Sequence, residues 1–449
     1  MAVEDEYYAP EGLETTAAAL GHDRPDVEQY AELASELRER VVGEVQFDEY
    51  AQILYATDGS IYQAKPAGVV QPTDVEDVRA TVEVAAKYDV PLLPRGAGSS
   101  LGGQTVGPGC IVLDFTRYMD EILDVDPETQ RATVQPGLVQ DHLEAHLAQY
   151  GLKFAPDPAS SNRSTLGGGI GNNSTGAHSV RYGITDAYTD ELKVILSDGS
   201  MIHNREVVLD SEEYEEIVAK DDREAHIYET VRDLVEEHHE QIEEKYPNLK
   251  RSVSGYNLDR VIYENDDGEE VINLSKLLVG AEGTLGVIVE ATLDLVTIPD
   301  ETALGLYFFD DLVETMEAVP EALDFPVSAV ELMDDEVFRL ARESDGYAKY
   351  AEPIPEDAKA ALMLEWDDEL VDDFEAAIAD TTEHFVENGD AFDVLEAYTE
   401  DDQADIWKLR KAAIPLLMSL DGDPKPYPFI EDATVPPEEL AEYVRSFED

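Results

Sequence analysis

A glycine-rich loop over residues 96–103, placed between two short apolar runs, constrains the fold more than any other feature of this chain. The runs over residues 90–93 and 110–115 are typical of buried strands. Glycine has no Cβ, so the backbone N–H groups of such a loop can point at an anion and approach it closely. A diphosphate needs several donors of this kind. The loop therefore predicts an anion-binding turn that leads from strand to strand.

The main alternative is a Rossmann dinucleotide site, for which a G-x-G pattern after a strand is a weak signal. Asp114 even favours that alternative, because this acid stands 18 residues after Gly96, near the position of a ribose-binding carboxylate. The sequence between them argues against it. Residues 99–109 contain four glycines and Pro108, which exclude the long helix that a βαβ unit requires.

Two further glycine-bearing segments follow along the chain. Residues 165–176 hold five glycines in twelve positions, with Ser, Thr and Asn between them, and residues 280–286 hold three glycines. Uncharged donors beside glycine suit close contact with the phosphates, sugar or ring edge of a cofactor. Ordinary surface turns would explain one such segment, but three in one region favour a cofactor site. Residues 96–103, 165–176 and 280–286 are called the first, second and third glycine segments below.

The secondary-structure pattern changes near residue 300, where we expect a domain boundary. A largely helical lead-in over residues 1–60, with a helix over 26–42, is expected before a mixed region over 61–300. After Pro299, short strands alternate with helices, which is an α+β layout. The four strands are expected over residues 304–309, 329–333, 361–366 and 394–398.

The chain is strongly acidic, with 101 Asp and Glu residues against 31 Lys and Arg and a net charge of −70. Such a charge repels nucleic acid and anionic lipid, so neither is expected as a partner. The acidic residues are spread along the whole sequence, which favours adaptation to molar salt over an acidic tail. At about 1 M salt the Debye length is about 3 Å, so the self-repulsion is screened. A solvated acidic surface without such adaptation is the alternative.

A single cysteine, Cys110, excludes an internal disulfide and a four-cysteine zinc or iron–sulfur site. No apolar run reaches the roughly 20 residues that span a bilayer, and the acidic start of the chain has no signal-peptide core. We therefore expect a cytoplasmic protein without a transmembrane segment, at most peripheral at the inner membrane face. His142 and His146 are spaced i, i+4, but no further ligand accompanies them, so no metal site is expected.

Six motifs stand in order along the chain: residues 94–104 (PRGAGSSLGGQ), 156–160 (PDPAS), 166–176 (LGGGIGNNSTG), 181–183 (RYG), 254–258 (SGYNL) and 280–286 (GAEGTLG). Together they resemble the motifs of FAD enzymes of the vanillyl-alcohol-oxidase and p-cresol-methylhydroxylase (PCMH) type. Within that superfamily the sequence is most similar to the glycolate oxidase D subunit and to D-lactate dehydrogenases. The resemblance covers roughly residues 60 to 440.

The resemblance implies an α+β fold. A PCMH-type FAD-binding domain of two α/β subdomains would occupy residues 61–300, and an α+β, ferredoxin-like substrate domain residues 301–449. The first glycine segment would bind the diphosphate of FAD, and the other two would line its adenosine and ribityl path. Because the first segment offers no histidine for covalent attachment, we expect non-covalent FAD. The residues expected to bind FAD are Arg95, Gly96, Ala97, Gly98, Ser99, Ser100, Leu101, Gly102, Gly103, Pro156, Asp157, Ser160, Thr165, Gly168, Gly169, Gly171, Asn172, Asn173, Thr175, Gly176, Glu282, Gly283, Gly286, Val287 and Ile288.

Oxidation of a 2-hydroxy acid requires a cation for the carboxylate, a base for the hydroxyl proton and a flavin that accepts hydride. Residues 407–415 (WKLRKAAIP) form an island of positive charge and resemble the family segment whose arginine holds the substrate carboxylate. Arg410 stands at that position, and a guanidinium can bind a carboxylate through two parallel hydrogen bonds. Lys411 is expected to point elsewhere. An exposed helix with surface salt bridges is the alternative. By resemblance, residues 431–436 form a strand beside the flavin.

The base is missing from this chain. By resemblance it would come from a later segment with His, Gly, Asp, Gly, Asn and a second His, whereas the last histidine here is His384. We therefore expect the chain to be a fragment of an enzyme that oxidises a small 2-hydroxy acid such as D-lactate or glycolate. Its electrons would pass to a quinone, a cytochrome or a fused or partner iron–sulfur domain, and a homodimer is compatible with the sequence. A flavin-binding subunit without chemistry of its own, and a reductase of a larger substrate, are the competing functions.

Overall fold

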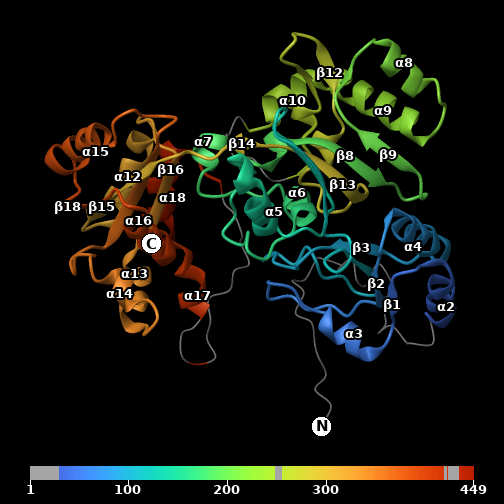
Figure 1. Cartoon of the computed structure of the whole chain (residues 1–449), viewed down its shortest axis with the longest axis horizontal. Coiled ribbons are helices and arrows are strands. Elements are labelled where there is room, and N and C mark those ends of the chain that lie inside the picture. The colour runs from blue at the N-terminus through green and yellow to red at the C-terminus, as the bar shows by residue number, and fades with distance from the viewer. Residues whose placement is uncertain (1–29, 248–254, 419–421, 423–433, 449) are drawn as a thin grey trace.

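The computed structural model describes residues 30–247, 255–418, 422 and 434–448, and these residues form two halves that join near residue 300 (Figure 1). The first half begins with a four-stranded sheet of order β1-β2-β4-β3, in which β2, β4 and β3 are parallel and β1 is antiparallel to β2. Its strands and neighbouring helices are β1 (Glu44–Gln46), β2 (Gly68–Gln71), β3 (Leu92–Arg95), β4 (Ile111–Asp114), α2 (Ala31–Arg40), α3 (Glu49–Leu54) and α4 (Val75–Tyr88).

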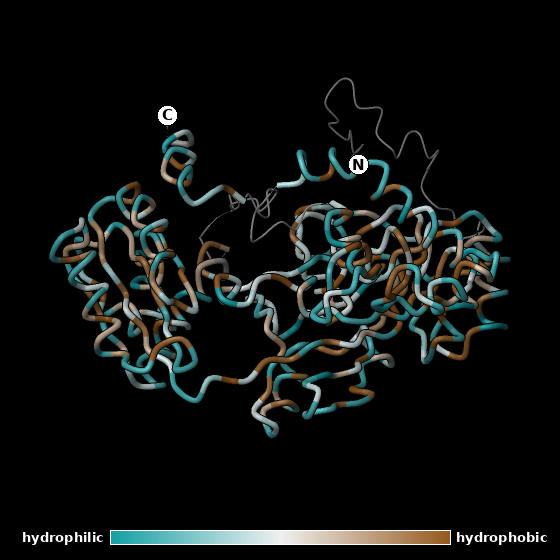
Figure 2. Tube along the Cα trace, turned by 90° about the horizontal axis from the view of Figure 1, so that it is seen from above, coloured by the Kyte–Doolittle hydropathy of each residue, from teal (hydrophilic) through white to brown (hydrophobic). Residues whose placement is uncertain are grey.

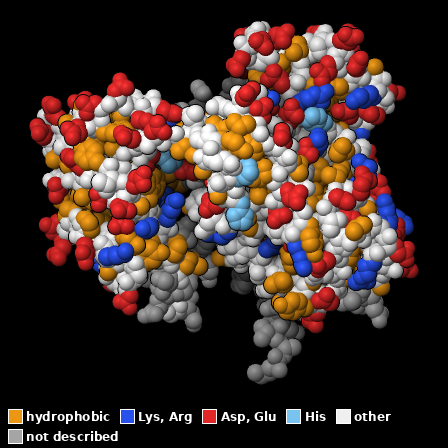
Figure 3. Space-filling view, viewed as in Figure 1, with side chains coloured by type: hydrophobic (Ala, Val, Ile, Leu, Met, Phe, Trp, Pro, Cys, Tyr) orange, Lys and Arg blue, Asp and Glu red, His pale blue; other side chains and the backbone are white. Residues whose placement is uncertain are grey.

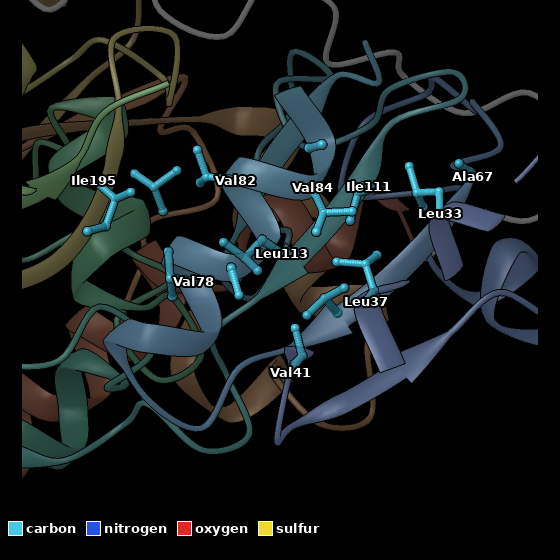
Figure 4. Packing of buried hydrophobic residues seen from close by; sticks show 14 of the residues in the cluster. Leu33, Leu37, Val41, Ala67, Val78, Val82, Val84, Ile111, Leu113 and Ile195 are labelled. Atoms are coloured by element: carbon cyan, nitrogen blue, oxygen red, sulfur yellow. The ribbon is translucent and has the colours of Figure 1, made fainter. Parts of the chain in front are cut away.

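The region before residue 60 is only partly helical, in contrast to the expected helical lead-in. Helix α2 lies within the helix expected over 26–42, of which residues 26–29 are outside the described part of the chain. Strand β1 pairs with β2 and so extends the first sheet. Leu33 and Leu37 of α2 pack with Val78 of α4 and with Ile111 and Leu113 of β4 (Figure 4). The lead-in is thereby tied to the first sheet by backbone pairing and by apolar burial.

The first glycine segment runs from β3 to β4 without a helix, as the sequence predicts. The two strands are parallel neighbours, with Leu92 opposite Ile111. Asp114, the acid that favoured a Rossmann site, is buried at the end of β4. Its carboxylate accepts hydrogen bonds from the Tyr55 hydroxyl at 2.6 Å and from the Gln71 amide at 2.8 Å. These hydrogen bonds occupy the Asp114 carboxylate, and no helix connects β3 to β4. The Rossmann alternative is therefore wrong on both points.

The second subdomain is built on a five-stranded antiparallel sheet of order β5-β6-β13-β8-β9. The strands are β5 (Ile122–Asp126), β6 (Arg131–Val134), β8 (Thr189–Ile195), β9 (Met201–Asn204) and β13 (Val287–Asp294). Helices α5 (Gln140–Leu147) and α6 (Leu166–Asn172) contribute to the same core. The second glycine segment therefore contains a helix, although glycine disfavours one. The Thr165 side chain caps this helix by accepting a hydrogen bond from Gly168 N at 3.2 Å.

A smaller three-stranded sheet extends the second subdomain. Its order is β10-β12-β11, and it shares a core with helices α8 and α9. The elements are β10 (Val207–Val208), α8 (Glu212–Val218), α9 (Arg223–Glu237), α10 (His239–Lys245), β11 (Ile262–Glu264) and β12 (Glu270–Ile272). Helix α11 (Ser275–Leu278) then leads into the third glycine segment. Strands β7 (Leu152–Lys153) and β14 (Val296–Thr297) pair next to the junction between the two halves (Figure 1).

The second half has a ferredoxin-like βαββαβ core, as expected. Its antiparallel sheet has the order β16-β17-β15-β18, and its strands are β15 (Thr302–Phe309), β16 (Ala329–Asp334), β17 (Ala360–Asp367) and β18 (Asp393–Ala397). Helices α12 (Leu312–Ala322) and α15 (Phe374–Thr382) cover one face. The other face is covered by α13 (Asp335–Glu343), α14 (Ala348–Ala351), α16 (Glu400–Lys411) and α17 (Ala413–Met418). Helix α18 (Leu440–Glu448) packs against α12.

Charge and hydropathy are distributed as burial requires. Apolar stretches run through the interior of both halves, while hydrophilic stretches lie on the outer turns (Figure 2). Acidic side chains cover the visible surface of both halves rather than one patch (Figure 3). Among the helices that the structure describes, none combines the length and the apolar character needed to cross a membrane.

Candidate functional site

A cavity of about 1160 Å³ lies between the three glycine segments and helix α16 of the second half. It slightly exceeds the roughly 300–1,000 Å³ that is typical of small-molecule sites, so a large ligand, or a large and a small ligand together, can fit. The glycine segments touch one another around it. Gly280 N donates to Ile170 O and Glu282 N donates to Gly171 O, both at 2.9 Å. These backbone bonds join the second and third segments into one wall.

The first glycine segment approaches the second very closely. A Cβ added to Gly96 would lie 2.1 Å from Thr165 Oγ1, so no larger residue fits there. Gly98 adopts a φ of +68°, and a Cβ at that position would lie 2.5 Å from the Arg95 guanidinium. The sequence therefore needs glycine at these two positions for the fold itself, independently of any ligand.

Glycines of helix α6 have a different environment. Outside the backbone of its own helix, a Cβ on Gly169 would meet Ser174 Oγ first, at 3.6 Å, and a Cβ on Gly171 would meet Glu282 Cα first, at 4.0 Å. Both glycines line the cavity. Protein packing thus leaves room for a side chain at these positions. Because glycine has no side chain, the backbone there borders the cavity directly. Such a wall fits close contact with a bound cofactor.

Arg95 stands directly before the first glycine segment. Its buried guanidinium donates to the carbonyl oxygens of Thr105 at 2.9 Å and Thr57 at 2.8 Å, and it lies 5.4 Å from the centre of the Tyr55 ring. Burial lowers the pKa of this guanidinium from its ordinary value, although nearby carboxylates oppose the shift. Arg95 lines the cavity, but these hydrogen bonds commit two of its nitrogens to backbone carbonyls of the protein.

Most residues that the sequence predicts for FAD line this cavity. They are Arg95, Gly96, Ala97, Gly98, Ser99, Ser100, Leu101, Asp157, Ser160, Thr165, Gly168, Gly169, Gly171, Asn172, Thr175, Gly176, Glu282, Gly283, Gly286 and Ile288.

Five predicted residues do not belong to the wall: Gly102, Gly103, Pro156, Asn173 and Val287. Gly103 takes a φ of +85° and faces the Tyr62 ring. Asn173 ends helix α6 in the left-handed conformation and is buried, and Val287 packs in the core of the first subdomain. These five residues belong to the motifs but do not border the cavity themselves.

Arg410 reaches the cavity from the second half, on helix α16. Its Nε donates to Glu331 Oε2 of β16 at 2.5 Å, and about a third of its side chain is exposed. Lys411 also lines the cavity, so the expectation that it points elsewhere is wrong. Lys408, on the same helix, does not line it and lies over the Tyr350 ring. The site therefore has two adjacent cations, one of which is held by a carboxylate.

His178, which was not predicted from the sequence, lines the same cavity. Its Nδ1 lies 2.6 Å from Asp157 Oδ2, and its Nε2 lies 2.6 Å from Glu365 Oε1 of β17. The Trp407 ring lies beside it, with centroids 5.7 Å apart. The only signal in the sequence was the position of His178, two residues after the second glycine segment.

His142 and His146 are exposed on α5, away from the cavity wall. Within residues 30–247, 255–418 and 434–448, no group of three or more His, Cys, Asp or Glu residues is arranged to hold a metal ion. Of the strand expected over residues 431–436, the part up to 433 lies outside the described residues, as does Ser254 of the fifth motif.

Comparison with known proteins agrees with this geometry. Residues 66–205 match the model of the FAD binding domain, and residues 298–449 match that of the C-terminal domain of FAD linked oxidases. Glycolate oxidase subunit GlcD of Bacillus subtilis is 30% identical over 419 residues, which cover 91% of this chain and 74% of that protein. The chain belongs to the family of FAD-linked oxidases that includes this subunit.

Other relatives extend well beyond the matched region. D-2-hydroxyglutarate dehydrogenase of Pseudomonas putida is 31% identical over 414 residues, or 90% of this chain, but the chain spans only 40% of that protein's length. The solved structure of p-cresol methylhydroxylase with substrate bound shares the fold, with a TM-score of 0.58 at 14% identity over 86% of this chain and 69% of that one. The FAD-linked oxidase therefore has the PCMH-type fold.

Proposed function

We propose that this chain is the FAD- and substrate-binding part of a dehydrogenase that oxidises a 2-hydroxy acid. The observation that carries the proposal is the position of Arg410. It lies in the wall of the cavity that the three glycine segments also line, although it comes from the other half of the molecule. A cation beside a flavin site is what the carboxylate of a 2-hydroxy acid requires.

The contact with Glu331 supports this role for Arg410. Because Glu331 accepts from Nε, it fixes the plane of the guanidinium. Among the described residues no other hydrogen bond from the Arg410 side chain is seen, so its terminal nitrogens can donate to a second carboxylate. Bound FAD would supply the hydride acceptor. The residues of this chain would bind and orient the substrate anion.

Lys411 bears on the choice of substrate. D-Lactate and glycolate carry one carboxylate, whereas the substrate named for the Pseudomonas putida relative carries two. A second cation next to Arg410 would serve the second carboxylate of such an acid. We therefore infer that a dicarboxylic 2-hydroxy acid binds at least as well as D-lactate or glycolate.

Non-covalent attachment of FAD is also proposed. His178 is the histidine in the described cavity wall, and hydrogen bonds to two carboxylates occupy both of its ring nitrogens. It is therefore not available as an attachment point. Because the single cysteine cannot hold an iron–sulfur cluster within this chain, the electrons would pass to a quinone, a cytochrome or an iron–sulfur partner.

The test is a set of three variants in a catalytically complete protein. Arg410→Ala should leave the FAD content unchanged and lower kcat/KM for the 2-hydroxy acid by a factor on the order of 10², because a charge-assisted contact contributes roughly 1.5–3 kcal/mol. Arg410→Lys should restore only part of this, since an ammonium cannot form two parallel bonds. Lys408→Ala is the matched control, because it removes a charge from the same helix outside the cavity.

Equal losses in Arg410→Ala and Lys408→Ala would show that α16 supplies only a diffuse positive field. No loss in Arg410→Ala would contradict the proposal and favour a flavin-binding subunit without hydroxy-acid chemistry.

A further inference from the structure

The short helix α7 (Ser179–Tyr182) joins the two halves of the molecule. It follows the second glycine segment directly and lies between the halves in Figure 1. Val180 packs against an apolar cluster of the second half. Arg181 forms ion pairs with Asp367 of β17 and with Glu369. Two side chains of a segment that begins in the cofactor wall, Val180 and Arg181, thus contact the substrate domain.

The positive charges at α7 and the negative charges of β17 match in spacing. His178 and Arg181 are three residues apart along one helical turn, so they lie on the same side of it. Glu365 and Asp367 are two residues apart on β17, so they face the same side of the sheet. Both carboxylates are almost fully buried, with side chains 6% and 2% exposed. Two cations of one turn therefore pair with two anions of one strand.

His178 differs from Arg181 because it also holds a partner on the cofactor side. Its backbone N donates to Asp157 Oδ1 at 3.1 Å, and its ring bonds Asp157 and Glu365 at once. Ionised carboxylates only accept hydrogen bonds, so both ring nitrogens must carry hydrogen and the ring is an imidazolium. Burial lowers the pKa of His178, but the hydrogen bonds to Asp157 and Glu365 outweigh it and raise the pKa to about 10.

Glu365 links His178 to helix α16 through hydrogen bonds. Its Oε2 accepts from Trp407 Nε1 at 3.0 Å, and its Oε1 also accepts from the Ser328 hydroxyl at 3.0 Å. Trp407 lies on α16, three residues before Arg410, and both line the cavity. A continuous chain of hydrogen bonds therefore leads from Asp157 in the cofactor wall to the helix that carries Arg410.

We propose that His178 is a positioning residue that couples cofactor binding to substrate-anion binding, by holding the Trp407–Arg410 turn against the cofactor wall. The proposal rests on the proposed function, because it assigns the anion to Arg410. Its consequence is thermodynamic: each ligand should bind more tightly when the other is present, and the coupling should depend on His178.

The test uses the FAD-loaded protein in molar salt. The sample is diluted, and the release of FAD is followed by the rise in flavin fluorescence, with and without oxalate as an unreactive carboxylate probe. Oxalate should slow the release at least about 5-fold in the wild type, the lower limit of ordinary coupling. In His178→Gln, which loses the charge and one of the two bonds, the effect of oxalate should fall below about twofold.

Arg181→Gln is the matched control. It removes the neighbouring ion pairs between the halves, but Arg181 does not line the cavity and makes no contact with Asp157 or Trp407 that the structure shows. This variant should keep the full effect of oxalate even where its melting temperature falls as far as that of His178→Gln. A purely structural role would weaken the effect equally in both.

Two further measurements test the proposal independently of whether His178→Gln folds. Trp407→Phe, which removes the bond to Glu365 and keeps an aromatic ring beside His178, should reduce the coupling even if His178→Gln does not fold. In the wild type at pH 8, ¹⁵N NMR of the His178 ring should show the imidazolium form. A neutral ring, or full coupling in His178→Gln, would overturn the proposal, as would a wild type whose FAD release ignores oxalate. Failure of the proposed function alone would look different: oxalate would slow the release, but no 2-hydroxy acid would reduce the flavin.

Discussion

Replacing Gly169 by alanine separates the role of the second glycine segment in folding from its role in binding. Gly169 lies within helix α6, and its added Cβ would meet Ser174 Oγ at an ordinary contact distance of 3.6 Å. Alanine is favoured over glycine in a helix by about 0.8–1.0 kcal/mol, so the variant should fold with equal or greater stability. The methyl group would nevertheless occupy space in the cavity wall where the backbone is expected to meet FAD.

The expected loss of FAD affinity follows from this crowding. Inserting one methyl into a close-packed contact costs about 1–3 kcal/mol, which corresponds to a rise in Kd of roughly 5- to 150-fold. The assay is a fluorescence titration of the flavin-free protein with FAD, together with thermal unfolding in the absence of FAD. Gly346→Ala is the control, since Gly346 is exposed, has no atom nearer than 4.0 Å to its added Cβ and lies outside the cavity wall. A Kd within twofold of the wild type in Gly169→Ala would refute the reasoning.

Three further outcomes are expected. Because the net charge is −70, the melting temperature should rise steeply between dilute buffer and ~2 M KCl, where screening is nearly complete; an unchanged value would contradict salt adaptation. Burial raises the pKa of Glu144 on α5 from 4.5 to about 7, so its ionisation should destabilise the fold as the pH rises from 4.5 through 7. Glu144→Gln should then be more stable than the wild type by about 1–3 kcal/mol at pH 8 and about equal to it in stability near pH 4, below the unfolded-state pKa, in denaturant unfolding. Acid precipitation should leave FAD in the supernatant, whereas flavin in the pellet would mean a covalent bond.

The first glycine segment shows what local sequence can predict. Pro108 and the glycines around it exclude a helix between β3 and β4, and the structure has none there. The four strands after residue 300 were recognisable for a similar reason, since each is a short apolar run bounded by polar turns. Local pattern was sufficient wherever the chain's own residues decide the conformation.

Helix α6 shows where local reasoning fails. Five glycines in the segment argue against a helix, but the Thr165 cap and the backbone bonds from the third glycine segment to Ile170 and Gly171 stabilise it. Those bonds come from residues more than a hundred positions away. Tertiary contacts thus override a weak propensity, and no local pattern reveals them.

His178 was missed for the same physical reason. Its two ring partners are Asp157, 21 residues away, and Glu365, 187 residues away. A histidine among uncharged neighbours gives no sign of two carboxylates that only the packed domains bring together. The expectation that Lys411 points elsewhere was wrong, because Lys411 lines the cavity as Arg410 does.

The central claim is that one cavity holds FAD and a 2-hydroxy acid anion that Arg410 binds. It is tested most directly by the visible absorption spectrum of the bound flavin, recorded while oxalate is titrated into the wild type and into Arg410→Ala. We predict a saturable spectral shift in the wild type, because the anion would bind next to the flavin, and at least about tenfold weaker binding in Arg410→Ala, as expected for loss of a charge-assisted contact. A wild-type flavin spectrum that does not respond to oxalate, or an equal shift with equal affinity in both proteins, would contradict the account.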